Sequence, residues 1–153
     1  MQMKQHVVVL GYGYLTRPVL DKLGKRVEYV FVATDAELAE RLRGRGYSVI
    51  EAESVNEDAL EEAEIDKARA VVVASESDAD DALAVLTARD TNPRVEIIAV
   101  ASSSENAEKL RRAGADTVIS PAEIVGKLLV ESALTGEDTS EIVGEIHDRV
   151  ISS

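Results

Sequence analysis

Two glycines, Gly11 and Gly13, follow a short apolar run that begins after His6. The run, residues 7–10, predicts a β-strand, and an amphipathic helical pattern follows it directly. Glycines at such a junction allow the backbone to approach a ligand closely, and the free N–H groups of the following helix favour an anion. The spacing therefore indicates a site for a nucleotide-sized anionic ligand.

The third glycine of the dinucleotide-binding fingerprint is replaced by Thr16. This replacement predicts looser packing of the helix against the strand, or a shifted helix. Tyr12 and Tyr14 flank the turn, and Leu15 follows them. The tyrosines either cover a ligand or fill the crevice themselves, and two glycines alone are also compatible with a turn that binds nothing.

More polar residues follow the next predicted strands, at the edge where open parallel sheets bind ligands. Asp35 either accepts hydrogen bonds from ribose hydroxyls or caps the next helix. The complete predicted ligand site is Gly11, Tyr12, Gly13, Tyr14, Leu15, Thr34, Asp35, Glu53, Ser54, Ser75 and Glu76.

No catalytic motif accompanies this site. The chain has no cysteine, no Gly-x-Ser-x-Gly elbow, no Walker loop and no histidine pair at metal-binding spacing. Its two histidines, His6 and His147, are far apart in the sequence. The acidic run 76–81 is typical of a solvated helix start, where negative charge complements the helix dipole, rather than of a cation site. We predict neither catalytic residues nor a metal site.

The formal charge of −12, from 29 acidic and 17 basic residues, argues against binding to nucleic acid or anionic lipid. It does not exclude an anionic nucleotide, because helix dipoles act at contact range. No apolar run approaches the ~20 residues of a transmembrane helix, and the N-terminus lacks a signal-peptide pattern. We expect a cytoplasmic domain without direct membrane insertion, which is compatible with the cytoplasmic part of a membrane assembly.

Short β-branched runs alternate with helical patterns along most of the chain. The predicted strands are 7–10, 27–32, 48–50, 70–74, 95–100 and 117–119, and the predicted helices between them are 15–23, 36–43, 57–62, 80–90 and 106–112. Most of the strands are continuously apolar, as in parallel sheets that are covered on both faces. The pattern predicts an α/β fold with a Rossmann-like, doubly wound, parallel six-stranded sheet in residues 1–120.

The remaining segment, 121–153, is predicted to contain a helix over 121–135, a polar joint and a short helix over 142–150. Ser120 and Pro121 provide a cap and a first helical residue. The apolar residues of the first helix are Ile124, Val125, Leu128, Leu129, Val130, Ala133 and Leu134. This set is too wide for one core-facing stripe, so the helix either lies deep on its own domain or also packs on a partner.

Four stretches, 6–13, 60–74, 86–89 and 105–121, resemble the RCK (or KTN) family of cytoplasmic regulators of potassium channels and potassium uptake systems. The last stretch is the most specific, and together they span most of residues 6–134. The resemblance implies a Rossmann-fold N-terminal lobe that forms a homodimer through helix 121–135, which crosses over to the partner lobe. In whole channels such lobes build a ring, and a small ligand in the Gly11 crevice shifts the ring and thereby the pore.

The family resemblance also implies NAD(H) or an adenine nucleotide (ATP, ADP or AMP) as the ligand. Three departures weaken that site: Ala33 stands where nucleotide-binding members carry an acid, and Tyr14 and Val100 stand where many carry a base. Each such charged contact contributes roughly 1.5–3 kcal/mol. Some relatives are gated by divalent cations instead, and Asp35 and Glu61 stand at positions of interest for that. The leading hypothesis is a non-enzymatic regulatory domain, and the alternatives are an NAD(P)-dependent oxidoreductase fragment and a scaffold with a vestigial nucleotide site.

Overall fold

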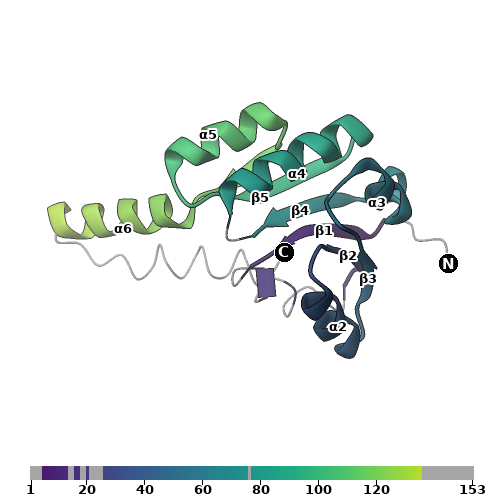
Figure 1. The fold of residues 1–153 in the computed structure, drawn as a ribbon. Coiled ribbons are helices and arrows are strands. Elements are labelled where there is room, and N and C mark those ends of the chain that lie inside the picture. Colours follow the sequence, from purple (N-terminus) through teal and green to yellow (C-terminus); the bar gives the residue numbers. More distant parts are fainter. Residues whose placement is uncertain (1–4, 14–15, 18–19, 21–25, 76, 136–153) are drawn as a thin grey trace.

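The computed structural model describes residues 5–13, 16–17, 20, 26–75 and 77–135. Its centre is one sheet of six parallel strands in the order β3-β2-β1-β4-β5-β6 (Figure 1). The strands are β1 (Val7–Tyr12), β2 (Tyr29–Ala33), β3 (Ser48–Glu51), β4 (Ala70–Ala74), β5 (Glu96–Val100) and β6 (Thr117–Ile119). This confirms the predicted Rossmann-like α/β architecture, in which crossover connections place helices on both faces of the sheet.

The helices agree closely with the predicted ranges. They are α2 (Ala36–Gly44), α3 (Glu57–Glu62), the short 3-10 turn η1 (Ile65–Lys67), α4 (Asp78–Thr91), α5 (Ser104–Ala113) and α6 (Pro121–Thr135). Figure 1 shows α4 and α5 on one side of the sheet, α2 on the other, and α6 extending away from it. Of the predicted helix 15–23, Thr16 and Arg17 are helical, and the predicted helix 142–150 lies outside the described residues. In the described part of the chain, no helix is long and apolar enough to cross a bilayer.

Side-chain caps set where four of these helices begin. Each capping side chain accepts a hydrogen bond from a backbone N–H in the first helical turn, and these N–H groups have no partner inside the helix. The capping residues are Asp35 for α2, Asn56 for α3, Ser77 for α4 and Ser103 for α5. Local chemistry therefore fixes the starts of the helices that follow β2, β3, β4 and β5.

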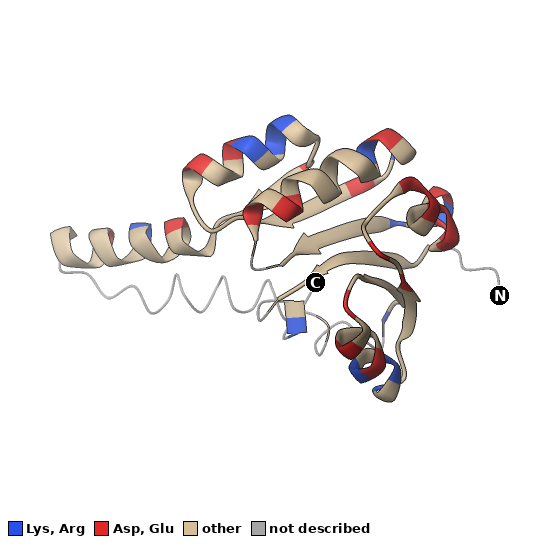
Figure 2. Ribbon diagram, viewed as in Figure 1, with Lys and Arg blue, Asp and Glu red and all other residues tan. Residues whose placement is uncertain are grey.

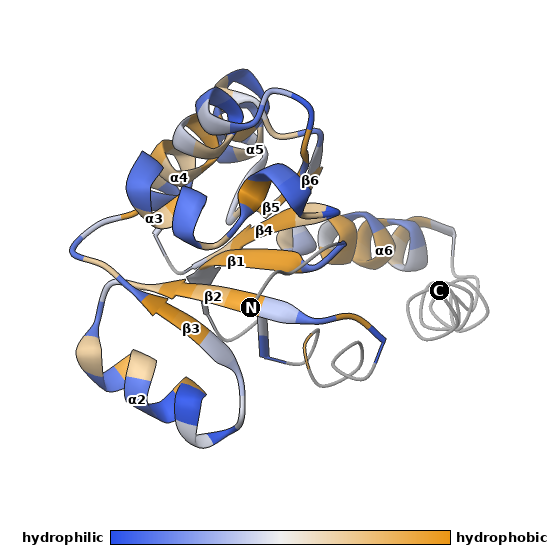
Figure 3. Cartoon of the chain, turned by 90° about the vertical axis from the view of Figure 1, so that its right-hand side faces the viewer, coloured by the Kyte–Doolittle hydropathy of each residue, from blue (hydrophilic) through white to orange (hydrophobic). Residues whose placement is uncertain are grey.

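The apolar core is divided by the sheet into two clusters, because alternate residues of each strand point to opposite faces. One cluster joins Val8, Val71 and Ile97 to the helices α3, α4 and α5, and the other joins Val7 and Val9 to residues around α2. Figure 3 shows the central strands as strongly hydrophobic. This two-sided burial explains why the strands read as continuously apolar in the sequence.

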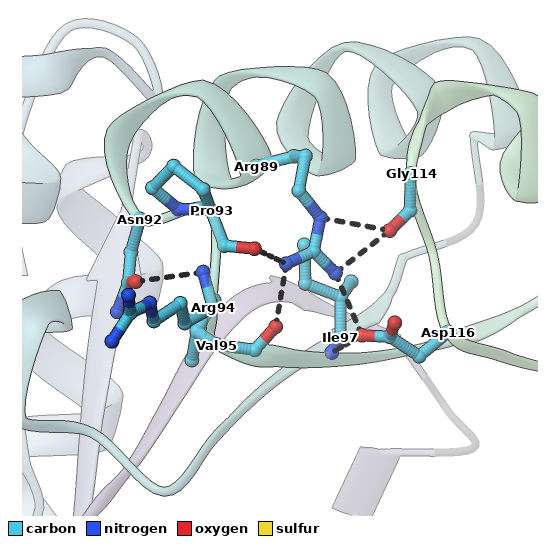
Figure 4. Close-up of polar contacts among 8 residues, drawn as sticks. All are labelled: Arg89, Asn92, Pro93, Arg94, Val95, Ile97, Gly114 and Asp116. Atoms are coloured by element: carbon cyan, nitrogen blue, oxygen red, sulfur yellow. Dashed lines mark hydrogen bonds and ion pairs between the residues drawn. The ribbon is translucent and has the colours of Figure 1, made fainter.

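Arg89, on α4, ties three segments of the fold together (Figure 4). Its Nη1 donates hydrogen bonds to the carbonyl oxygens of Pro93 (2.9 Å) and Val95 (2.7 Å). Its Nε and Nη2 both donate to the carbonyl of Gly114, at 3.1 and 2.9 Å. Gly114 has a φ of +123°, and a Cβ there would lie 3.0 Å from Cγ of Arg89. Both backbone conformation and space therefore require glycine at the end of α5.

Asp116 completes this cluster at the start of β6. Its Oδ2 lies 2.6 Å from Nη2 of Arg89 and also accepts the backbone N–H of Ile97 at 2.8 Å. Arg89, Gly114 and Asp116 all lie in stretches that carry the family resemblance. In this structure these three residues join α4, β5 and β6, and none of them lines the cavity beside the glycine loop.

We expect Arg89→Ala to lower the free energy of unfolding by about 2–4 kcal/mol, because it leaves several backbone carbonyls and Asp116 without a charged donor. Urea unfolding followed by circular dichroism measures this loss. Arg111→Ala is the matched control, since Arg111 makes only an exposed ion pair with Glu108, which is worth about 0.5 kcal/mol. Equal losses for the two variants would contradict the structural role of Arg89.

Candidate functional site

A cavity of about 400 Å³ opens at the carboxyl ends of β1, β2, β3 and β4. Its volume falls in the range of small-molecule sites, and its position is the one where open α/β sheets bind ligands. The predicted site residues that line it are Gly11, Tyr12, Thr34, Glu53, Ser54 and Ser75. The fold therefore brings together residues from the end of β1 and from the three loops after β2, β3 and β4, which are separated by up to 64 positions in the chain.

Other predicted residues stand apart from this cavity. Gly13 and Asp35 are not among the residues that line it. The Oδ1 atom of Asp35 accepts the backbone N–H of Glu37 at 3.0 Å, so the capping alternative is the one that the structure shows. Tyr14, Leu15 and Glu76 lie outside the described residues.

Gly11 lies within β1, one residue before the observed end of that strand, and not in the turn where the sequence placed it. It pairs with Val73 after a register shift that begins at Val9. A Cβ on Gly11 would lie 2.8 Å from the backbone N of Ser75, and one on Gly13 would lie 2.7 Å from the carbonyl oxygen of Ala74. Both glycines are thus required by the close approach of β1 to the end of β4, whether or not a ligand is bound.

Thr16 corrects the expectation of looser packing. It is 2 % exposed, and its Oγ1 accepts the N–H of Gly13 at 3.2 Å. The same hydroxyl lies 3.0 Å from the carbonyl of Ala74 and 3.4 Å from that of Gly11, to which it can donate. The threonine hydroxyl therefore fastens the glycine loop to β4, where the full fingerprint relies on a third glycine for close contact.

Tyr12 forms part of the cavity wall and leaves the cavity open. Its ring packs edge-on against Phe31, with ring centres 5.9 Å apart and planes at 69°. Phe31 in turn packs against Tyr47 at 5.1 Å. Such edge-to-face contacts hold an aromatic ring in place, so Tyr12 lines the cavity and does not fill it.

The sequence analysis missed Asp80 and Asp81, which line the cavity together with Glu53. Asp81 is 1 % exposed, although the acidic run predicted a solvated helix start. Its Oδ1 lies 2.5 Å from Oγ of Ser75, and its Oδ2 accepts the backbone N–H of Ser75 at 3.1 Å. The sequence did contain a signal that Asp81 faces the core. Position 81 precedes the buried Ala84 and Val85 by three and four residues, which places all three on one face of α4.

The electrostatic environment of Asp81 disfavours its charged form. Burial raises the pKa of Asp81, the two hydrogen bonds from Ser75 lower it in part, and the nearby charges of Asp78 and Asp80 raise it further. Figure 2 shows these acids as red segments at the start of α4. A buried carboxylate lies directly beneath the glycine loop, so this part of the cavity repels additional negative charge.

The cavity offers hydrogen-bond acceptors rather than cations. Among its described lining residues are three carboxylates and no lysine or arginine. The N–H groups of Gly13 and Ser75, which face the loop, already donate to Thr16 and Asp81. Such a lining suits sugar hydroxyls better than phosphate groups. Within the described residues, no group of three or more His, Asp or Glu side chains lies close enough to hold a metal ion.

His6 has a structural position. It is fully buried and its Nε2 donates a hydrogen bond to the carbonyl of Ala63 at 2.8 Å. Its hydrogen-bond partner among the described residues is a backbone carbonyl and not a nucleophilic side chain, and His147 lies outside the described residues. The described contacts of His6 therefore fix the start of β1 against the end of α3.

We expect Asp81→Asn to raise Tm at pH 7 by a few degrees, since 1 kcal/mol corresponds to about 2–4 °C in a domain of this size. The pKa of Asp81 is higher in the folded protein than in the unfolded chain. The stability that Asp81 contributes is therefore complete at pH values below its pKa in the unfolded chain, and it is lost as the pH rises through its pKa in the folded protein. The increase in Tm caused by Asp81→Asn should therefore become smaller as the pH falls toward 4. Scanning calorimetry from pH 4 to 8 measures it, with Asp90→Asn as control, since Asp90 is exposed near the other end of the same helix. A gain that is independent of pH would contradict this explanation.

The six-stranded parallel sheet and the cavity at its carboxyl edge define a Rossmann-like α/β domain. The sequence profile described as the TrkA-N domain matches residues 7–121. The chain belongs to this family. The resemblance to RCK domains that the sequence predicted is confirmed by the relatives.

Among relatives, the voltage-gated potassium channel Kch of Escherichia coli is 30 % identical over 143 residues, which cover 90 % of this chain and 34 % of Kch. The solved structure of GsuK bound to ADP is 28 % identical with a TM-score of 0.76, over 88 % of this chain and 36 % of that one. The GsuK channel bound to NAD is 28 % identical with a TM-score of 0.75, over 84 % of this chain and 23 % of that one. The chain thus spans about a third of the length of Kch.

Proposed function

We propose that this chain is a regulatory domain of a potassium channel or potassium uptake system, which binds an adenine nucleotide or NAD(H) and forms a homodimer. The observation that carries the proposal is an open cavity at the carboxyl edge of a TrkA-N sheet. Its support from relatives is that Kch is a potassium channel and that GsuK binds ADP and NAD. The role is regulatory and not catalytic, and it is exercised at the cytoplasmic face of the membrane protein.

In this proposal, the cavity binds mainly the nucleoside part of the ligand. Glu53 and Asp80 line the wall and supply carboxylate acceptors for ribose hydroxyls, in place of the acid that Ala33 lacks at the end of β2. Leu83 and Leu38 provide apolar contacts for a base. Because Asp81 disfavours nearby phosphates, the site favours ligands with fewer negative charges, such as NAD or AMP, over ATP.

Nucleotide binding is tested by calorimetric titration of the purified chain with AMP, ADP, ATP, NAD and NADH. We expect Leu83→Asp to weaken binding about fivefold or more, close to 1 kcal/mol, because it adds a carboxylate to the acidic cavity. Leu86→Asp is the matched control, since Leu86 is exposed on the same helix but does not line the cavity. Affinity for Leu86→Asp should stay within about twofold of the unmodified chain.

Three other results would replace this proposal. If none of the nucleotides produces heat or a thermal shift, the result favours a scaffold with a vestigial site. Hydride transfer from NADH to carbonyl compounds favours an oxidoreductase fragment. A response to Ca²⁺ alone favours the divalent-cation alternative, for which Asp35 and Glu61 were noted.

The proposed dimer surface is α6. No residue of α6 is buried, so the helix does not lie deep on its own domain, which corrects one of the two sequence-based alternatives. Its exposed large apolar residues are Ile124, Val125, Leu129, Val130 and Leu134. Figure 2 shows few charged segments along this helix. Exposed apolar patches of this kind are typical of protein interfaces, and a second copy is the partner that accounts best for the resemblance to ring-forming lobes.

We expect Leu129→Asp to weaken self-association at least tenfold, since a charge in the centre of an apolar interface loses its hydration without a partner. Light scattering over a concentration series measures the change. The same substitution at Leu86, on α4, serves as control and should leave the dimer intact. A chain that is monomeric before any substitution would contradict the dimer without affecting the nucleotide proposal.

A further inference from the structure

The carboxyl group of Asp81 is enclosed by protein, although it lines the cavity at the carboxyl edge of the sheet. A Cβ built on Gly11 would lie 3.0 Å from its Oδ1 atom, so the carboxyl group is close to the backbone of β1 at that point. A ligand phosphate that approaches Gly11 therefore also approaches Asp81. Two negative charges at this distance, partly shielded from water, repel each other strongly.

The hydrogen bonds of Ser75 suit both a charged and a neutral Asp81. Oγ of Ser75 lies 2.5 Å from Oδ1 of Asp81 and 3.3 Å from the carbonyl oxygen of Ser77, and it accepts the N–H of Ser77 at 3.1 Å. When Asp81 is charged, the Ser75 hydroxyl donates to the carboxylate. When Asp81 is neutral, its own O–H donates to Oγ of Ser75, whose hydrogen then turns to the carbonyl of Ser77.

The second carboxyl oxygen keeps its partner in both states. The backbone N–H of Ser75 donates to Oδ2 of Asp81 at 3.1 Å, and this bond does not depend on which proton Oδ1 carries. A proton is thus added to Asp81 without leaving any of these buried polar atoms unpaired, which would otherwise cost stability. The site needs no rearrangement to hold that proton.

Charges near Asp81 favour its neutral form. Burial is the main cause that raises the pKa of Asp81, and the charges of Asp78 and Asp80 on the same helix add to it. From the other walls of the cavity, Glu53 and Tyr12 are the titratable groups among the described lining residues. In the part of the chain that the structure describes, no lysine or arginine forms an ion pair with Asp81.

The elements packed against α4 bring no buried charge to Asp81. These elements are α3, η1, α5, β1, β4 and β5. Lys67 of η1 is half-buried and is paired with Glu64. The other charged residues of these elements are exposed: Glu57, Asp58, Glu61, Glu62, Asp66, Glu96, Glu105, Glu108, Lys109, Arg111 and Arg112.

We propose that Asp81 takes up a proton when the nucleotide binds, an inference that rests on the proposed function, so that acidification strengthens binding. The anionic phosphates favour the neutral carboxyl group, and by linkage the neutral carboxyl group favours the phosphates. The affinity is therefore highest at pH values below the pKa of Asp81 in the free chain. It falls as the pH rises from there to the higher pKa of Asp81 in the complex.

The test is calorimetric titration of the chain with NAD from pH 5 to 8. NAD is the probe because its diphosphate is esterified on both sides, whereas the terminal phosphates of AMP, ADP and ATP titrate with a pKa of about 6. We expect the affinity at pH 5 to exceed that at pH 8 about fivefold or more. Titrations in two buffers of different ionisation enthalpy should show uptake of a fraction of one proton.

Variants of two residues assign this proton to Asp81. Asp81→Asn should bind NAD with an affinity that is independent of pH to within about twofold, and with no linked proton. Histidine side chains also titrate in this range, and this variant leaves both histidines in place. Ser75→Ala removes a hydrogen bond that lowers the pKa of Asp81, so it should move the decline in affinity to a higher pH.

Asp90→Asn is the matched control, since it makes the same change at an exposed position near the other end of α4. It should leave the pH profile of the unmodified chain unchanged. The inference alone is overturned if NAD binds with an affinity independent of pH, or if Asp81→Asn keeps the pH dependence of the unmodified chain. Absence of NAD binding at every pH overturns the inference together with the nucleotide proposal, so the two failures are distinguishable.

Discussion

The close approach of β1 to the end of β4 is the constraint on which the site depends. At Gly11 and Gly13 there is no room for a side chain, because the backbone of Ala74 and Ser75 fills that space. Thr16 adds a hydrogen-bonded link across the same junction. This packing brings the glycine loop and the start of α4 together, and the cavity at the carboxyl edge is a consequence of it.

The close approach of β1 to β4 also places the carboxyl group of Asp81 beneath the glycine loop, where the dinucleotide-binding fingerprint has no acidic residue. Asp81 is held beneath the loop by the N–H and hydroxyl of Ser75. The loop donors that would bind phosphate in a full fingerprint are thereby bonded within the protein. The volume of the cavity is therefore that of a small-molecule site, and its carboxylates suit hydroxyl groups better than phosphate groups.

Residues that carry the family resemblance serve two separate purposes in this fold. Arg89, Gly114 and Asp116 hold α4, β5 and β6 together, and none of them lines the carboxyl-edge cavity. Gly11 belongs to both groups, since it lines the cavity and allows the strands to pack. A match to the TrkA-N family thus reports mainly on the scaffold, and the ligand has to be inferred from the lining of the cavity.

The sequence alone determined the six parallel strands and α2 to α6 to within about two residues, because apolar periodicity and helix-start signals act over a few neighbouring positions. It left Asp35 open between a helix cap and a ribose acceptor, and the structure shows the cap. It also located six residues of the cavity, since loops after parallel strands meet at one edge of the sheet. Only the tertiary structure decided that Asp81 is buried, that Arg89 joins three segments and that the hydroxyl of Tyr29 has no hydrogen-bond partner among the described residues. These properties depend on atoms contributed by segments distant in the sequence, whose distances and burial are set only when the sheet and its helices pack together.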